Sequence, residues 1–152
     1  KDFFNTRKMT FSPNPVEYFL LADKTRMMDW PESDHLPKCQ ILNANNAEQI
    51  WAARKNLFFK PRQSFGSKQT YKGAKISRKL FDDLIKQDFL AQEYIPANEL
   101  TFETPTGSQD FKYDLRFYAY QGRVQSVVAR LYQGQVTNLQ TPLGGFACVR
   151  FL

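Results

Sequence analysis

The sequence of 152 residues contains a single histidine, His35. This histidine lies in a segment that contains two prolines, Pro31 and Pro37, which favours an exposed loop over a catalytic position. Any Ser-His-Asp or Cys-His enzyme would depend on this one residue. These classes of catalyst are therefore disfavoured.

Cysteine is also scarce, since only Cys39 and Cys148 are present. Neither has a second cysteine or a histidine at metal-ligand spacing. We therefore expect two buried thiols in a reducing compartment, the cytoplasm. No apolar run approaches the length of a membrane span and no signal-peptide pattern is found, so no membrane role is expected. The chain begins at Lys1 without a methionine, as if cut from a longer protein.

Aromatic and basic residues are abundant. Hydrophobic residues make up 42% of the chain and aromatic residues 15%, with 14 Phe and 7 Tyr, which indicates a packed core and favours strands. The formal net charge of +6 suggests an anionic partner, which could be a phosphate ligand, a nucleic acid or a membrane surface. Composition does not separate these three.

The order of the local signals predicts an α+β fold. Helices are expected at 14–30, 46–55 and 77–87, strands at 39–42, 57–60, 89–95 and 100–103, and an antiparallel hairpin at 111–132 around Gln121-Gly122. Strands and helices in mixed order, together with antiparallel hairpins, indicate mixed or antiparallel sheets with covering helices. A doubly wound parallel sheet is not expected.

Two segments at strand ends suit a nucleotide. Lys60 ends an apolar strand, and the polar, basic loop 62–73 that follows offers backbone amides to a phosphate. Gln92 lies near the end of another strand, where a strand edge suits adenine, and Glu99 further on could accept hydrogen bonds from ribose. An ordinary basic hairpin and a solvated acidic turn are the structural alternatives.

Two further segments suit a transferring phosphate and its metal. Asp114 and Arg116 alternate on one strand face, and Arg130 lies on the partner strand. Asn138 precedes Gly144-Gly145, where glycine permits close backbone approach to a ligand. A solvent-facing strand and a plain turn are the alternatives here.

The order of these motifs resembles the ATP-grasp superfamily, closest to its glutamate-ligase and glutathione-synthetase-like branch. The series is Asp23-Lys24, FFKP at 58–61, GSK at 66–68, QEYI at 92–95, DLR at 114–116, TNL at 137–139 and Gly144-Gly145. The resemblance covers roughly residues 15 to 147. It implies an enzyme in which ATP phosphorylates a carboxylate and an amine or thiol attacks the acyl phosphate.

The resemblance also implies a set of site residues, with ATP and Mg²⁺ as cofactors and a small carboxylate as substrate. The phosphate contacts would come from Lys24, Lys60 and the loop residues Ser64, Gly66, Ser67 and Lys68. The adenine and ribose contacts would come from Gln92, Glu93, Ile95 and Glu99. The transfer and substrate side would be lined by Arg116 and Arg130, with Asp114 and Asn138 at the metal.

Three segments follow from this resemblance: a helical linker at 1–38, a small lobe with the phosphate loop at 39–98, and the start of a second lobe at 99–152. The ExN segment that holds magnesium in the family is not present, so the chain is expected to be either truncated or circularly permuted. We expect the remainder of the parent chain as a partner and no ligase activity from these residues alone.

Two other readings stay open. The first is a noncatalytic binding module on the same fold. The second is an RNA-binding domain that uses the basic loop 60–79, with Phe65 and Tyr71 as stacking residues. Nucleic-acid binding is not expected, because the order of motifs is explained by the ATP-grasp resemblance and would have no reason in an RNA-binding domain.

Overall fold

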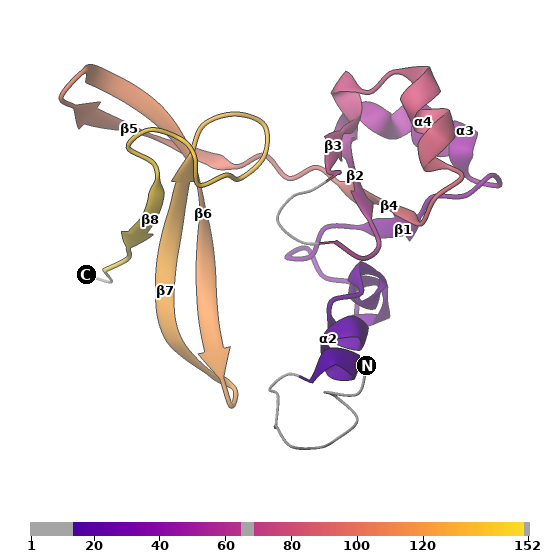
Figure 1. Cartoon of the computed structure of the whole chain (residues 1–152), viewed down its shortest axis with the longest axis horizontal. Helices are drawn as coiled ribbons and strands as arrows, with labels where there is room; N and C mark the ends of the chain where they lie inside the picture. The colour runs from indigo at the N-terminus through magenta and orange to yellow at the C-terminus, as the bar shows by residue number, and fades with distance from the viewer. Residues whose placement is uncertain (1–13, 65–68, 151–152) are drawn as a thin grey trace, which may run out of the picture. The chain divides into compact units, whose positions relative to one another are not determined.

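The computed structural model describes residues 14–64 and 69–150, and the chain divides into two units between Tyr94 and Ile95. Each unit contains a four-stranded antiparallel sheet, and the helices belong to the first unit (Figure 1). This is the α+β class predicted from the sequence. The predicted segments 1–38, 39–98 and 99–152 map onto two units, because residues 14–38 group with the first sheet.

The sheet of the first unit has the strand order β1-β4-β2-β3. Its strands are β1 (Cys39–Ile41), β2 (Leu57–Pro61), β3 (Tyr71–Lys72) and β4 (Phe89–Glu93). Every neighbouring pair is antiparallel. β4 lies between two partners, so its residues are buried as far as Gln92. The predicted strands at 39–42, 57–60 and 89–95 are confirmed to within two residues.

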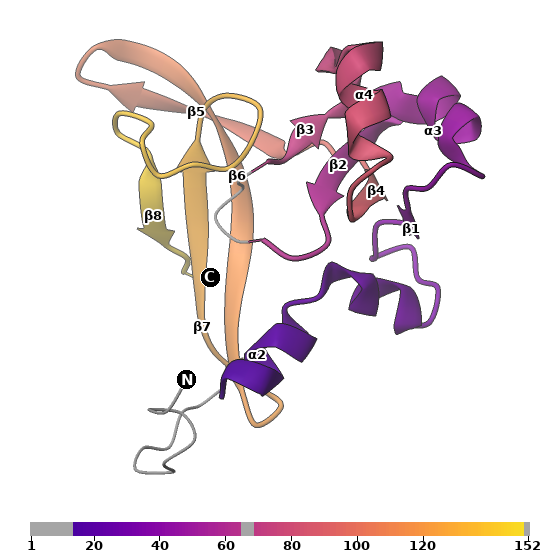
Figure 2. The same ribbon diagram turned by 45° about the vertical axis from the view of Figure 1, so that its right-hand side comes forward.

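Helices α3 (Ala47–Ala53) and α4 (Arg78–Leu84) pack on one face of this sheet (Figure 2). The predicted helix at 77–87 begins where expected, since the Ser77 hydroxyl accepts a hydrogen bond from the Leu80 N–H at 3.2 Å. Apolar side chains of the helices meet those of the strands in one buried cluster. It comprises Leu42, Ala47, Ile50, Phe59, Phe81, Leu84, Phe89 and Ala91.

Two 3₁₀ turns, η2 (Arg54–Asn56) and η3 (Gly73–Lys75), lie against each other beside this core. A Cβ atom at Gly73 would lie 2.0 Å from the carbonyl oxygen of Arg54 and 2.9 Å from that of Leu57. Only glycine therefore permits this contact between the end of α3 and the chain after β3.

The segment before the first sheet differs from its prediction. One helix was expected at 14–30, but the chain forms α2 (Pro15–Leu21) and then the 3₁₀ helix η1 (Lys24–Asp29). The break occurs because Asp23 has an extended backbone and its carboxylate accepts a hydrogen bond from the Thr25 N–H at 2.9 Å. Asp23 therefore caps a new helix instead of continuing the first one.

The second unit is a meander in which each strand pairs with the next along the chain. Its strands are β5 (Asn98–Thr104), β6 (Gly107–Tyr120), β7 (Arg123–Tyr132) and β8 (Gly145–Cys148). The predicted hairpin at 111–132 is confirmed, and its turn has positive φ at Gln121 (49°) and Gly122 (73°). Two consecutive positive φ angles give the turn whose twist matches paired strands.

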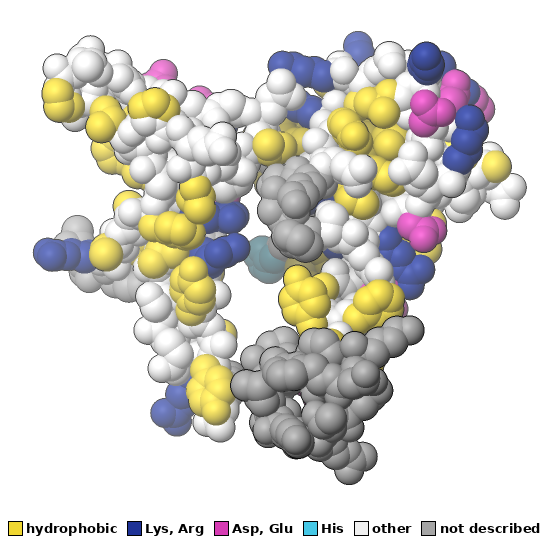
Figure 3. Space-filling model, in the orientation of Figure 1, with side chains coloured by type: hydrophobic (Ala, Val, Ile, Leu, Met, Phe, Trp, Pro, Cys, Tyr) yellow, Lys and Arg dark blue, Asp and Glu magenta, His cyan; other side chains and the backbone are white. Residues whose placement is uncertain are grey.

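The two faces of this second sheet have different characters. On β6, Asp114 and Arg116 point to one face, while Leu115 and Phe117 point to the other. Leu115 is 45% exposed and Phe117 57% exposed, and hydrophobic side chains lie along this unit in Figure 3. An apolar sheet face is thus left open within the described residues.

Candidate functional site

One face of the first sheet carries the polar residues that the sequence singled out. Residues paired directly across antiparallel strands share a face, so the pairs Phe58–Gln92 and Cys39–Gln92 place these three side chains together. Lys60 follows Phe58 by two residues and shares that face. The helices α3 and α4 pack against the opposite face, through Phe59 and Ala91.

Lys60 and Gln92 are hydrogen-bonded on this face. The Lys60 ammonium donates to the Gln92 side-chain oxygen, and the Gln92 amide nitrogen donates to the Met27 sulfur at 3.7 Å. An ammonium group has only donors, so the oxygen of the Gln92 amide must face Lys60 and its NH₂ must face Met27. The predicted phosphate lysine and the predicted adenine residue are therefore neighbours.

Lys24 is held at the exit of β2. Its ammonium donates to the carbonyl oxygen of Ser64 at 3.0 Å and to the Ser64 hydroxyl at 3.4 Å, and it lies 3.5 Å from the carbonyl oxygen of Arg62. These contacts bring η1 to the beginning of the loop that was predicted to hold phosphate. Gly66, Ser67 and Lys68 of that loop lie outside the described residues.

An ion pair fixes Lys24 in this place. The Asp23 carboxylate accepts from the guanidinium of Arg62 at 2.7 and 2.8 Å, and from the hydroxyl of Thr25 at 2.7 Å. The Arg62 hydrogen bonds, followed by those from Thr25, hold the pKa of Asp23 far below its usual range. Asp23 is buried and ionised, so it ties the start of η1 to the residue that follows β2.

The two lysines share one electrostatic environment. Burial lowers the pKa of Lys60, and the charge of Lys24 lowers it further, while Cys39 opposes both effects. Burial also lowers the pKa of Lys24 and raises the pKa of the Cys39 thiol. Two partly desolvated cations on one face favour an anion between or beside them.

The other residues that were predicted to contact adenine and ribose have different partners. The Glu93 N–H donates to the carbonyl oxygen of Lys38 at 2.8 Å, and the Glu93 carboxylate accepts from the Lys38 N–H at 3.1 Å. Ile95 and Glu99 belong to the second unit, where Glu99 pairs with Lys112 across β5 and β6. The structure thus brings Lys24, Lys60 and Gln92 together and assigns Ile95 and Glu99 to the other unit.

A second polar cluster lies in the second unit. Asp114 and Arg130 are direct cross-strand partners, with Arg130 Nε 2.6 Å from the carboxylate, and the Thr137 hydroxyl donates to the other carboxylate oxygen at 2.9 Å. Arg116 follows on the same face and is exposed. These contacts confirm the predicted grouping of Asp114 and Arg130 and leave the Arg116 guanidinium accessible.

Asn138 organises the loop between β7 and β8. Its side-chain oxygen accepts from the Gln140 N–H and from the N–H and hydroxyl of Thr141, and its NH₂ donates to the carbonyl oxygen of Gln133 at 2.8 Å. An amide oxygen with three donors offers little to Mg²⁺ unless the loop rearranges. Within residues 14–64 and 69–150, no cluster of three or more His, Cys, Asp or Glu side chains has the arrangement of a metal site. The Asp114–Asn138 metal site stays a prediction.

Three residues near Lys24, Lys60 and Gln92 were not predicted from the sequence. They are Met27, Arg62, and Cys39 as a neighbour of Lys60. The Asp23–Arg62 ion pair had one signal in the sequence: Asp23 precedes Lys24, and Arg62, of opposite charge, lies two residues after Lys60. Opposite charge alone does not identify Asp23 and Arg62 as an ion pair, because they are 39 positions apart in the sequence.

No family model, no curated protein and no solved structure matches the chain significantly. Among the described residues, the helices are all too short or too polar to cross a bilayer.

Proposed function

We propose that this chain is the nucleotide-binding part of an ATP-grasp ligase that joins a carboxylate to an amine or thiol through an acyl phosphate. The observation that carries the proposal is that Lys60 and Gln92 meet on the sheet face opposite α3 and α4, with Lys24 at the exit of β2. The sequence order of motifs supplies the reaction class. The cytoplasm, where thiols such as Cys39 stay reduced, is the proposed compartment.

The two lysines supply the charge that phosphate binding requires. Lys60 projects from β2 and Lys24 belongs to η1, so two separate elements would each contribute an ammonium group to a bound phosphate. A lysine ammonium is a compact point charge that suits phosphate oxygens. Gln92 is buried and both ends of its amide already have partners, so it would read the edge of the base only after its hydrogen bond to Met27 opens.

The second cluster would serve the substrate and the transfer step. In the proposed reaction the terminal phosphoryl group of ATP is transferred to a carboxylate oxygen of the substrate, and ADP is the leaving group. The amine or thiol then attacks the acyl carbon and inorganic phosphate leaves. Arg116 and Arg130 would stabilise the negative charge on the transferring group and on the substrate carboxylate. Asp114 is the residue that would hold Mg²⁺, which neutralises phosphate charge when bound.

A ligand panel tests this proposal directly. Calorimetric titration of the chain with ATP, ADP, inorganic phosphate and a single-stranded oligouridylate should show binding of both nucleotides at low millimolar concentration or better. Weak or absent binding of the oligonucleotide at matched phosphate concentration is expected. Preferential binding of the oligouridylate would instead favour the RNA-binding alternative.

Catalysis needs its own assay, because a noncatalytic binding module would also bind ATP. Coupled ADP release against paired carboxylate and amine substrates should be measured for this chain and for any longer protein that contains it as the parent. Turnover by the parent that is abolished by Arg116→Met would support a ligase. Nucleotide binding without turnover by either protein would leave a binding module as the correct description.

A further inference from the structure

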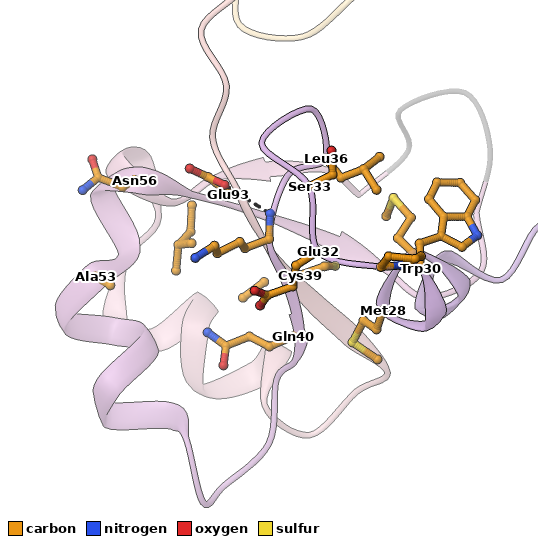
Figure 4. A pocket seen from close by; sticks show the side chains of 15 residues that line it. Met28, Trp30, Glu32, Ser33, Leu36, Cys39, Gln40, Ala53, Asn56 and Glu93 are labelled. Atoms are coloured by element: carbon orange, nitrogen blue, oxygen red, sulfur yellow. Dashed lines mark hydrogen bonds between the residues drawn. The ribbon is translucent and has the colours of Figure 1, made fainter.

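A cavity of about 540 Å³ lies within the first unit, around strand β1, and shares Met27, Cys39 and Glu93 with the proposed nucleotide site. Its lining comes from both sides of the sheet (Figure 4). Met27, Met28 and Trp30 come from η1 and its end, whereas Ala53 and Asn56 come from α3 and the turn after it. The middle of the lining is β1 itself, through Cys39 and Gln40.

β1 is an edge strand, and its hydrogen-bonding pattern shows which backbone groups face outward. The Leu42 N–H donates to Phe89 and the Glu93 N–H donates to Lys38, so the alternate residues Cys39 and Ile41 turn their backbone groups away from β4. The carbonyl oxygen of Ile41 already accepts from the Asn46 side chain, at 2.8 Å. That contact independently confirms the outward direction.

Three outward groups remain available for another strand: the Cys39 N–H, the Cys39 carbonyl and the Ile41 N–H. Between residues 14 and 150, leaving out 65–68, none of the three has a hydrogen-bond partner within the protein. Their order of donor, acceptor and donor along one edge is the pattern that an added strand completes.

The two sides of the cavity differ in chemistry. On the side of η1, the lining is apolar and soft, with Met27, Met28, Trp30 and Leu36. On the side of α3, it is more polar, with Gln40, Asn56 and Glu93. An extended peptide presents alternate side chains to opposite sides, so it would place apolar residues against η1 and polar residues against α3.

Charge further restricts the occupant. The lining contains two carboxylates, Glu32 and Glu93, and one ammonium, Lys38, whereas the whole chain has a net charge of +6. Neither carboxylate forms an ion pair within the described part of the chain. Lys60 lies beside Cys39 on the other face of the sheet, so the negative charge of Glu93 favours basic side chains of the partner on the α3 side of the cavity alone.

We propose that the edge of β1 is a docking site for an extended segment of a partner protein in which apolar and basic residues alternate. The segment adds a strand beside β1 through the Cys39 and Ile41 backbone. Its apolar side chains enter the Met27–Trp30 side of the cavity, and its basic side chains lie toward Glu93. Because β1 has only three residues, the added pairing is short and the affinity is modest.

The test uses a capped hexapeptide of alternating valine and lysine, titrated into the whole chain and followed by amide NMR. The Cys39 and Ile41 amide signals should shift, and their hydrogen exchange should slow. Two N-methylated peptides are matched controls, because methylation of the residues that face β1 should abolish binding whereas methylation of the alternate residues should preserve it. Equal binding of both methylated peptides would overturn the proposal.

Charge and site are tested separately. Replacing every lysine of the peptide by glutamate, or introducing Glu93→Gln, should weaken binding by about two- to fivefold. Lys79→Met, on the far side of α4, should leave the affinity unchanged. Shifts confined to residues outside the cavity, or no binding by the alternating peptide, would also contradict the proposal.

Discussion

Replacing Lys60 by methionine is the sharpest test of the nucleotide site. Methionine retains most of the apolar stem of lysine, while the ammonium is lost together with its hydrogen bond to Gln92 and its position over the Phe58 ring. A hydrogen bond to a charged group contributes about 1.5–3 kcal/mol, which corresponds to about a tenfold to 150-fold loss of nucleotide affinity. Calorimetry with ATP and ADP at one fixed salt concentration measures this loss.

The matched control for this variant is Lys79→Met. Lys79 is exposed on α4, which packs on the opposite face of the sheet, and its removal changes the net charge by the same amount. Any long-range effect of net charge therefore appears in both variants, while a direct phosphate contact appears only in Lys60→Met. Equal affinity of the two variants and the unmodified chain would refute the assignment of Lys60 to phosphate.

Three further predictions concern pH and stability. Burial lowers the pKa of Lys60, and a bound phosphate would raise it again. Between the pKa of the free protein and that of the complex, nucleotide binding should therefore take up protons and weaken as pH rises. Calorimetric titrations in buffers of different ionisation enthalpy measure this proton uptake. Asp23→Asn should unfold at a lower temperature than the unmodified chain at pH 7, and the difference should shrink as pH falls below about 4. The folded pKa of Asp23 is depressed, so its contribution is complete above the unfolded pKa and is lost on acidification. Gly73→Ala should destabilise the first unit by about 1–3 kcal/mol in urea unfolding, because the new Cβ would clash with the Arg54 carbonyl oxygen. Gly107→Ala has open space around its Cβ and should cost about 1 kcal/mol through its positive φ alone. Equal effects of the two glycine substitutions would argue against the tight contact at Gly73.

The strands and the long hairpin could be predicted because their signals are local. Apolar runs bounded by turn residues mark β2 and β4, and Gln121-Gly122 between two alternating segments marks the turn of β6 and β7. The error at 14–30 has a local cause as well. Asp23 lies within an apparently continuous helical pattern, but its carboxylate accepts a hydrogen bond from the Thr25 N–H and so caps a second helix.

The site itself could be predicted only in part. The sequence singled out Lys24, Lys60 and Gln92 one by one, and strand register explains why two of them meet: Phe58 pairs with Gln92, so Lys60 lies diagonally beside it. The position of Lys24 has no such local rule. It depends on the ion pair between Asp23 and Arg62, and a contact between segments so far apart leaves no periodic signal.

The partners of the two lysines give the last and most discriminating prediction. Lys24 donates to carbonyl and hydroxyl oxygens and Lys60 to an amide oxygen, and neither forms an ion pair within the described residues, because the nearby carboxylate of Asp23 is bound to Arg62. The face therefore keeps its positive charge, as a phosphate site requires. Gln92→Glu is nearly isosteric and places a carboxylate on the Lys60 ammonium. The existing hydrogen bond already has an ionised donor, Gln92 is only 5% exposed, and a carboxylate has no NH₂ to donate to Met27, so the new ion pair should not raise the free energy of unfolding. The variant should lower nucleotide affinity about tenfold or more by cancelling the charge. Urea unfolding and calorimetry on the same preparation measure both effects. Unchanged nucleotide affinity in a variant that urea unfolding shows to be folded would mean that the positive charge of this face has no role in nucleotide binding.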